Sequence, residues 1–151
     1  MSALESIPVR VVEPVLDQAA LENARLVNAA RAALLTSGTA VTVDGIAGVL
    51  GKDPDTVRRW VARQRKARRL VTVTHEGQVY IPTFQLDAGF DVDDAVAGIV
   101  ERLVDQGMDG WAVWHWFETP NSWLDHDTPA QLVRSGTFDA IGHAVDGMFQ
   151  E

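Results

Sequence analysis

The sequence predicts a mainly helical protein with one small β-hairpin. Along most of the chain, apolar residues recur three and four positions apart, as on one face of a helix. Apolar and polar residues alternate instead over residues 70–81, where His75-Glu76-Gly77 forms a turn. Turn residues divide the chain into an N-terminal arm and helix (1–38), a central domain (39–84) and a helical domain (90–151).

The charge of the chain is distributed unevenly. Eight of the thirteen Lys and Arg residues lie within residues 52–69, which carry a net +6, although the whole chain carries −8. Residues 70–151 carry two basic and fourteen acidic residues, a net −12. Lys and Arg gathered on one surface supply contacts to DNA phosphates, although a solvated, salt-bridged helix face has the same composition. The asymmetry predicts one surface for nucleic acid and another surface with a different task.

Residues 42–66 predict two short helices joined by a tight turn. Thr42 is expected to cap the first helix, and Asp53 the second, with Pro54 at its first position. Such a pair forms a helix-turn-helix, and the hairpin that follows adds a wing. The run TVDGIAGVLGKDPDTVRRWV (42–61) resembles the DNA-binding segments of excisionase-like and MerR-like winged domains. An ordinary helical hairpin is the alternative, and the basic cluster disfavours it.

In a helix-turn-helix the second helix enters the major groove. We expect Val57, Trp60 and Val61 to face inward, which leaves the basic residues outside. Arginine pairs with guanine through two parallel hydrogen bonds, and flanking Lys and Arg side chains hold phosphates. The predicted contacts to double-stranded DNA are made by Lys52, Thr56, Arg58, Arg59, Arg63, Arg65, Lys66 and Arg69.

An Ala- and Leu-rich stretch from Val15 to about Leu35 predicts a helix, because it contains no Pro or Gly. Its apolar residues near helical spacing predict a buried face formed by Leu26, Ala30, Ala33 and Leu34. Helix-turn-helix proteins commonly bind DNA as dimers. We therefore expect a homodimer, formed either by residues 15–35 or by the C-terminal helices.

The C-terminal segment predicts a helical module rich in tryptophan. Asp91 is expected to cap a helix with an apolar stripe from Val92 to Leu103, and Asp109 to cap the next one. Four of the five tryptophans lie within residues 111–123, where they serve either as core or as a protein interface. Two further helices follow: Thr128-Pro129-Ala130-Gln131 fits a capping box, and Thr137 is expected to cap the last helix.

The run WHWFETPNSWLDHDTPAQLVRSGTFDAIGHAVDGM resembles the C-terminal toxin-binding domain of MbcA/ParS/Xre-type antitoxins. The shared positions include Trp116, Thr119-Pro120-Asn121 and Thr128-Pro129, although the glycine expected after Leu124 is replaced within Asp125-His126-Asp127. The resemblance implies a DNA-binding repressor that also grips a RES-type, NAD-degrading toxin, with residues 145–151 approaching that toxin. The implied partner-binding residues are Trp116, Asn121, Trp123, Val145, Met148 and Phe149.

Other functions are less well supported by the sequence. No Gly-rich phosphate loop, nucleophile elbow or zinc motif is present, so we expect neither an enzyme nor a metal or cofactor. The N-terminus lacks the pattern of a signal peptide, and no apolar run approaches the roughly 20 residues that span a bilayer, which predicts a cytoplasmic protein without a membrane partner. The rival hypothesis is a stand-alone phage- or plasmid-type DNA-binding regulator whose C-terminal domain serves oligomerisation.

Overall fold

The computed structural model describes residues 17–150, and the chain divides into two units, residues 1–33 and 34–151. Within the first unit the described residues form most of helix α2 (Gln18–Thr36), which agrees with the predicted helix. Its buried face is shorter than expected, because Leu34 is buried whereas Leu26 is 71% exposed. The predicted arm over residues 1–14 lies outside the described residues.

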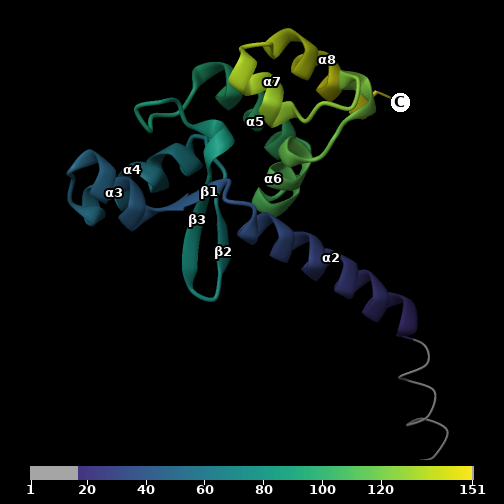
Figure 1. Cartoon of the computed structure of the whole chain (residues 1–151), viewed down its shortest axis with the longest axis horizontal. Coiled ribbons are helices and arrows are strands. Elements are labelled where there is room, and N and C mark those ends of the chain that lie inside the picture. The colour runs from purple at the N-terminus through teal and green to yellow at the C-terminus, as the bar shows by residue number, and fades with distance from the viewer. Residues whose placement is uncertain (1–16, 151) are drawn as a thin grey trace, which may run out of the picture. The chain divides into compact units, whose positions relative to one another are not determined.

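The second unit begins with a small antiparallel sheet and two helices (Figure 1). The strands pair in the order β1-β3-β2, so β3 is the central strand. Tyr80 of β3 lies opposite Thr42 of β1 on one side and opposite Val73 of β2 on the other. The predicted hairpin is present as β2 and β3, although its first strand begins at Val73 and not at Leu70, and β1 was not predicted. In chain order these elements are β1 (Ala40–Thr42), α3 (Val43–Leu50), α4 (Pro54–Lys66), β2 (Val73–His75) and β3 (Gln78–Pro82).

Local side-chain chemistry sets the ends of α3 and α4. The Thr42 hydroxyl accepts a hydrogen bond from the Gly45 N–H at 3.0 Å, and the Asp53 carboxylate accepts one from the Asp55 N–H at 2.8 Å. Gly51 ends α3 with φ of 65°, a conformation that costs glycine little. Pro54 occupies the first turn of α4, where its missing N–H has no intrahelical role. Both predicted caps are therefore confirmed.

Four α-helices form the C-terminal part of the second unit. The first of them is capped by Asp93, whose side chain accepts hydrogen bonds from the N–H groups of Ala95 and Val96. The prediction that Asp91 caps this helix was therefore wrong. Thr128 and Gln131 form the predicted capping box. Thr137 precedes the last helix without a side-chain cap bond. The elements are η1 (Thr83–Gln85), α5 (Asp94–Asp105), α6 (Gly110–Glu118), η2 (Ser122–Leu124), α7 (Pro129–Ser135) and α8 (Phe138–Met148).

Two hydrophobic clusters stabilise the second unit, and both cross the predicted boundary between residues 84 and 90. In one cluster Val73 and Phe84 pack with buried residues of α5, α6 and α8. In the other, Val92 and Ala97 pack with the inner faces of α3 and α4. The predicted domains 39–84 and 90–151 thus lie in one unit and share their cores, and their boundary stays a prediction.

Polar and close contacts join the sheet to the C-terminal helices. Gln85 is completely buried, and its amide donates to the carbonyls of Val71 at 2.9 Å and Pro82 at 3.0 Å and accepts from the Val71 N–H at 2.7 Å. Phe84 stacks on Phe117 of α6 with ring centroids 3.9 Å apart. Gly110 lies against the backbone of Thr72, where any Cβ would come within 2.1 Å of the carbonyl oxygen. These contacts fix the hairpin against α6.

The structure is therefore mainly helical, as the sequence predicts, and its small antiparallel sheet has one strand more than the predicted hairpin. Among residues 17–150, no helix has both the length and the apolar character needed to cross a membrane.

Candidate nucleic-acid interface

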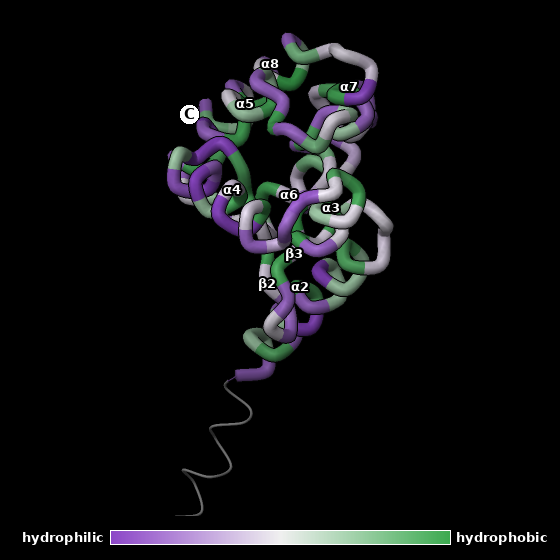
Figure 2. The backbone as a smooth tube through the Cα atoms, turned by 90° about the vertical axis from the view of Figure 1, so that its left-hand side faces the viewer, coloured by the Kyte–Doolittle hydropathy of each residue, from purple (hydrophilic) through white to green (hydrophobic). Residues whose placement is uncertain are grey.

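Helix α4 separates its apolar and cationic side chains cleanly. Val57 and Val61 are buried, and the half-buried Trp60 packs against the same cluster. The hydropathy view shows α4 as a largely hydrophilic segment (Figure 2). The residues predicted to contact DNA lie off the buried face: Arg69 is half-buried, and the exposed ones are Lys52, Thr56, Arg58, Arg59, Arg63, Arg65 and Lys66.

Five of these cations make no ion pair with any carboxylate of residues 17–150: Lys52, Arg59, Arg63, Arg65 and Lys66. Arg59 has only a long contact of 3.5 Å to the Thr56 hydroxyl. Their charge is therefore available to an anionic partner, and we call these five residues the free cation set. The basic cluster is therefore only partly salt-bridged, and a solvated helix face remains the alternative to a DNA-binding surface.

The remaining arginines of the cluster are paired. Arg58 bonds Asp55, one turn earlier on α4. Arg69 reaches Asp94 at 2.5 Å, next to the cap of α5, and also donates to the Gln64 side chain at 3.3 Å. Arg68 bonds Asp105 at the end of α5. Arg68 and Arg69 therefore hold the end of α4 against α5, and Arg69 is less available for DNA than the sequence indicated.

The free cations and Arg58 occupy three strips of the surface formed by α4 and the turn before it. Arg58 and Arg65 line one flank, where a groove of about 330 Å³ separates α4 from the hairpin residues Gly77 and Gln78. Lys52 and Arg63 line the opposite flank. The 3.6-residue helical period places Arg59 and Lys66 between the flanks. The surface thus presents cations across a wide arc.

The groove between α4 and the hairpin is also lined by residues that are not among the predicted DNA contacts. Gln78 and the small residue Ala62 line it, and Asp44 adds one carboxylate. Gly77 turns the hairpin with φ of 77°. The turn at Gly77 was visible in the sequence, but the distance from α4 to the hairpin depends on long-range packing.

A second exposed surface lies at Trp123. The side chain is 64% exposed, and its ring lies over Gly147 of α8, where a Cβ would come within 2.6 Å of the ring. The Asn121 side chain accepts a hydrogen bond from the Trp123 N–H at 2.8 Å, which fixes the start of η2. The contact between Trp123 and Gly147 was not predicted, although a glycine within a helix interior was a signal for a close approach.

The other predicted partner-binding residues differ in their exposure to solvent. Val145 is completely buried in the core, where it cannot touch a partner. Trp116 is half-buried and packs edge-on against Phe117 at a centroid distance of 5.1 Å, and Phe149 packs on the same cluster. Met148 is 38% exposed. Only Trp123 and Met148 of this predicted set are therefore well exposed, and Glu151 at the end of the predicted contact segment lies outside the described residues.

The loop beside Trp123 depends on Asn121. Its N–H donates to the Asp127 carbonyl at 3.0 Å, and its own carbonyl accepts from the His126 N–H at 2.9 Å. The half-buried Asn121 thus organises the backbone between η2 and α7. Its predicted role in partner binding would be indirect, through the position of Trp123.

The fold and its surface define a mainly helical protein with a small antiparallel sheet and a cationic helix on its exterior. A solved structure with this fold is the NMR structure of Rv2175c, with a TM-score of 0.59 and 21% sequence identity. The match covers 72% of this chain and 80% of that chain. At this level of identity the similarity concerns the fold. No family model matches the sequence, and no curated protein matches it.

Proposed function

We propose that this chain is a DNA-binding regulator of transcription, in which α3, α4 and the β2–β3 hairpin act as a winged helix-turn-helix. The observation that carries the proposal is the free cation set on the exposed surface of α4 and the turn before it. Unneutralised Lys and Arg side chains release counterions from DNA when they bind phosphates, and this release drives sequence-independent binding. The order helix, turn, helix, hairpin supports the same class.

In the proposed complex α4 lies in the major groove, with its N-terminal residues at the base edges. Arg59 and Arg63 are the candidates for guanine, because both are exposed and free of carboxylate partners in the described chain. Lys52 and Arg65 lie on the two flanks and suit phosphates. Arg58 can contribute only by exchanging Asp55 for DNA, so its net gain is smaller.

The groove between α4 and the hairpin suits a sugar-phosphate strand. Its volume of about 330 Å³ is open to solvent, and Arg58 and Arg65 supply positive charge along one side. Gly77 and Gln78 of the hairpin form the opposite side without a charged group, and Asp44 is the one carboxylate that lines the groove. The wing would therefore follow the DNA backbone while α4 reads the groove.

The salt dependence of binding tests this proposal. We expect fluorescence anisotropy with a labelled duplex to show affinity falling with a log–log slope of roughly −3.5 to −4.5, for about four or five phosphate contacts. Affinity that is absent at low salt, or a slope near zero, would reject the helix as a DNA-binding surface.

We further propose that the C-terminal helices bind a protein, as the resemblance to MbcA/ParS/Xre-type antitoxins implies. Trp123 supports this, because a large exposed aromatic ring held in one position is typical of interface hot spots. The expected partner is a RES-type, NAD-degrading toxin, which makes the protein an antitoxin. The alternative partner is a second copy of the chain, as in a stand-alone regulator.

One variant distinguishes these two partners. Trp123→Ser removes the exposed ring and keeps the backbone N–H that donates to the Asn121 side chain at the start of η2. If the toxin hypothesis holds, the variant fails to neutralise a toxin co-expressed from an adjacent gene, and its mass by light scattering is unchanged. A shift from dimer to monomer would support the oligomerisation role instead.

A further inference from the structure

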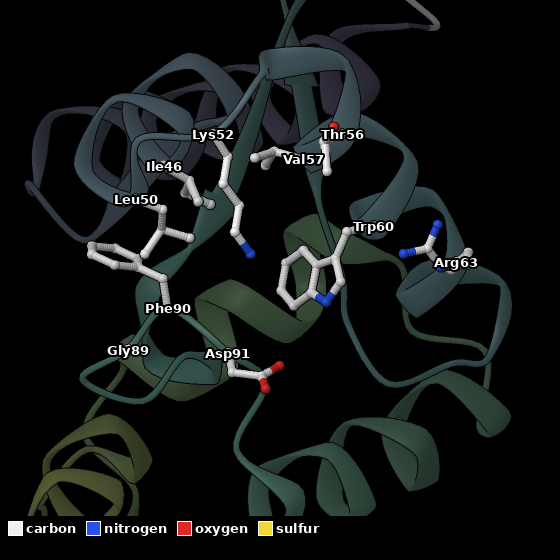
Figure 3. A pocket seen from close by; sticks show the side chains of 10 residues that line it. All are labelled: Ile46, Leu50, Lys52, Thr56, Val57, Trp60, Arg63, Gly89, Phe90 and Asp91. Carbon is white, nitrogen blue, oxygen red and sulfur yellow. The ribbon is translucent and has the colours of Figure 1, made fainter.

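A cavity of about 200 Å³ opens between the end of α3, one flank of α4 and the loop before α5. Figure 3 shows the Trp60 indole facing this space, with the Lys52 ammonium and the Asp91 carboxylate pointing into it. Leu50 and Phe90 close the opposite side. The cavity thus combines apolar walls with charged groups at its rim.

The backbone at Phe90 adopts an uncommon conformation. Its φ of 60° lies in the left-handed region, which bulky side chains rarely occupy. Asp87 holds the loop in this shape, because its carboxylate accepts from the N–H groups of Gly89 at 2.9 Å and Asp91 at 3.0 Å. The Phe90 N–H also donates to the Asp87 carbonyl at 3.0 Å. Backbone strain of this kind concentrates at ligand clamps, and here it keeps an aromatic ring in the cavity wall.

The charges at the rim favour an anion. Lys52 and Arg63 make no ion pair within residues 17–150, and Asp91 is the single carboxylate that lines the cavity. The rim therefore has one positive charge in excess. Because the walls are aromatic and aliphatic, a ligand that suits both features has an apolar ring and a carboxylate.

The volume limits such a ligand to one ring. An apolar cavity of about 150 Å³ is known to admit benzene, so about 200 Å³ admits a ring with a short substituent. We propose that this cavity is a binding site for a small aromatic carboxylate, whose ring lies between Trp60 and Phe90 and whose carboxylate faces Lys52, with Arg63 further along the rim.

The site overlaps the proposed DNA surface. Lys52, Thr56 and Arg63 line the cavity and are also predicted DNA contacts. A carboxylate bound there would neutralise Lys52 and lower the affinity of α4 for DNA. This regulatory consequence rests on the proposed DNA-binding function, whereas the ligand site itself does not.

The first experiment measures ligand binding without DNA. Titration of the full chain with phenylacetate, followed by NMR at the Trp60 indole N–H, should give a saturable shift in the millimolar range. The signal is assigned by its loss in Trp60→Phe. Phenethylamine has the same ring and the opposite charge, so it should bind several-fold more weakly. Absence of a saturable phenylacetate shift, or equal affinity for the amine, would overturn the site.

A matched pair of variants tests the charge contact. Lys52→Gln should raise the phenylacetate dissociation constant by about two- to fivefold, which is the range of an exposed ion pair. Lys66→Gln removes the same charge from a position outside the cavity and should leave that constant unchanged. An equal effect of both variants would mean that net charge alone attracts the anion, which contradicts a defined site.

The second experiment adds DNA. Saturating phenylacetate should weaken duplex binding by the wild-type chain, while phenethylamine at the same concentration and ionic strength should not. A chain that binds phenylacetate but keeps its full DNA affinity would overturn the regulatory role and leave the site standing. A chain that binds no DNA refutes the proposed function, and the NMR titration then still decides whether the ligand site exists.

Discussion

The two parts of the basic cluster contain the same residue types but differ in their partners. Along α4 the side chains of Arg59, Arg63 and Arg65 have no carboxylate partner in the described chain, whereas Arg68 and Arg69 bond Asp105 and Asp94 of α5. Arg68 also takes a left-handed φ of 61° at the end of α4, where glycine is usual. The cations of α4 are therefore available to an external anion, whereas Arg68 and Arg69 connect the end of α4 to α5 by ion pairs.

This difference shows that the charge a basic segment presents to solvent depends on carboxylates that are distant in the sequence. The acidic partners of Arg68 and Arg69 lie 37 and 25 residues further along the sequence. The net +6 of residues 52–69 overstates the charge that faces solvent on α4, since these carboxylates neutralise part of it. Ion pairing with carboxylates, which depends on the fold, determines which arginines are available to bind phosphate.

The largest expected effect is on DNA affinity. The triple variant Arg59→Ala, Arg63→Ala, Lys66→Ala removes three free cations from the outer surface of α4 and should weaken duplex binding by at least about 100-fold. The log–log salt slope should become shallower by about one for each of the three side chains that contacts a phosphate. Because all three residues are exposed, the circular dichroism spectrum should be unchanged. Wild-type affinity in this variant would exclude α4 as the DNA-binding surface.

The next prediction concerns the buried hydrogen bonds by which Gln85 holds η1 against residues 71 and 82. Gln85→Met keeps a similar shape but leaves the Val71 N–H and two carbonyls without partners in a buried place. We expect the free energy of unfolding to fall by about 2–4 kcal/mol, measured by urea denaturation. Gln78→Met, at the exposed hairpin, is the control and should change little.

The number of transitions in the same urea experiment tests the predicted domain boundary. Since both clusters cross residues 84–90, we expect the wild-type second unit to unfold in one step. Two separated transitions would mean that the predicted domains 39–84 and 90–151 are independently stable.

The comparison of free and paired arginines is tested directly by two matched substitutions. Arg65→Gln should make the salt slope shallower by about one and leave stability unchanged. Arg69→Gln should leave the slope unchanged and lower the free energy of unfolding by at most about 1 kcal/mol, because the lost ion pair with Asp94 is partly exposed. Asp94→Asn should reproduce the stability loss. If Arg69→Gln instead changed the slope, Arg69 must leave Asp94 when DNA binds.

Features that depend on neighbouring residues were predictable from the sequence. Thr42, Asp53, Asp109 and Thr128 act as caps because their side chains bond N–H groups two or three residues ahead. At the start of α5 three aspartates, Asp91, Asp93 and Asp94, lie within four residues, and the apolar stripe that begins at Val92 favours Asp91 as the cap. Asp91 instead bonds the Val92 N–H, and the loop built by Asp87 shifts the start of the helix to follow Asp93.

Features that depend on distant residues were not predictable. Strand β1 has only three residues and exists because it pairs with residues 80–82. Val145 has the helical spacing of a core residue, and the family resemblance placed it in the interface, whereas the structure buries it. Asp125 and His126 take left-handed φ values of 53° and 68°, in the segment where the resemblance leads us to expect a glycine, so this loop keeps a conformation that favours glycine without one.

The smallest expected effect concerns Glu118, at the end of α6. Burial raises the pKa of its carboxyl above the usual 4.5, and the nearby Arg134 opposes this only in part. One carboxylate oxygen is buried and has no hydrogen-bond partner among the described residues. Because the folded state holds this proton more tightly than the unfolded state, ionisation of Glu118 destabilises the fold at neutral pH.

Glu118→Gln should therefore raise the midpoint of thermal unfolding at pH 7. The gain should shrink as the pH falls toward 4.5, because below that value the carboxyl is protonated in both the folded and the unfolded states. Glu101→Gln, exposed on α5, removes the same formal charge and serves as the control. Equal gains from both variants at pH 7 would mean that relief of the net −8 stabilises the chain, and that burial of Glu118 contributes nothing specific.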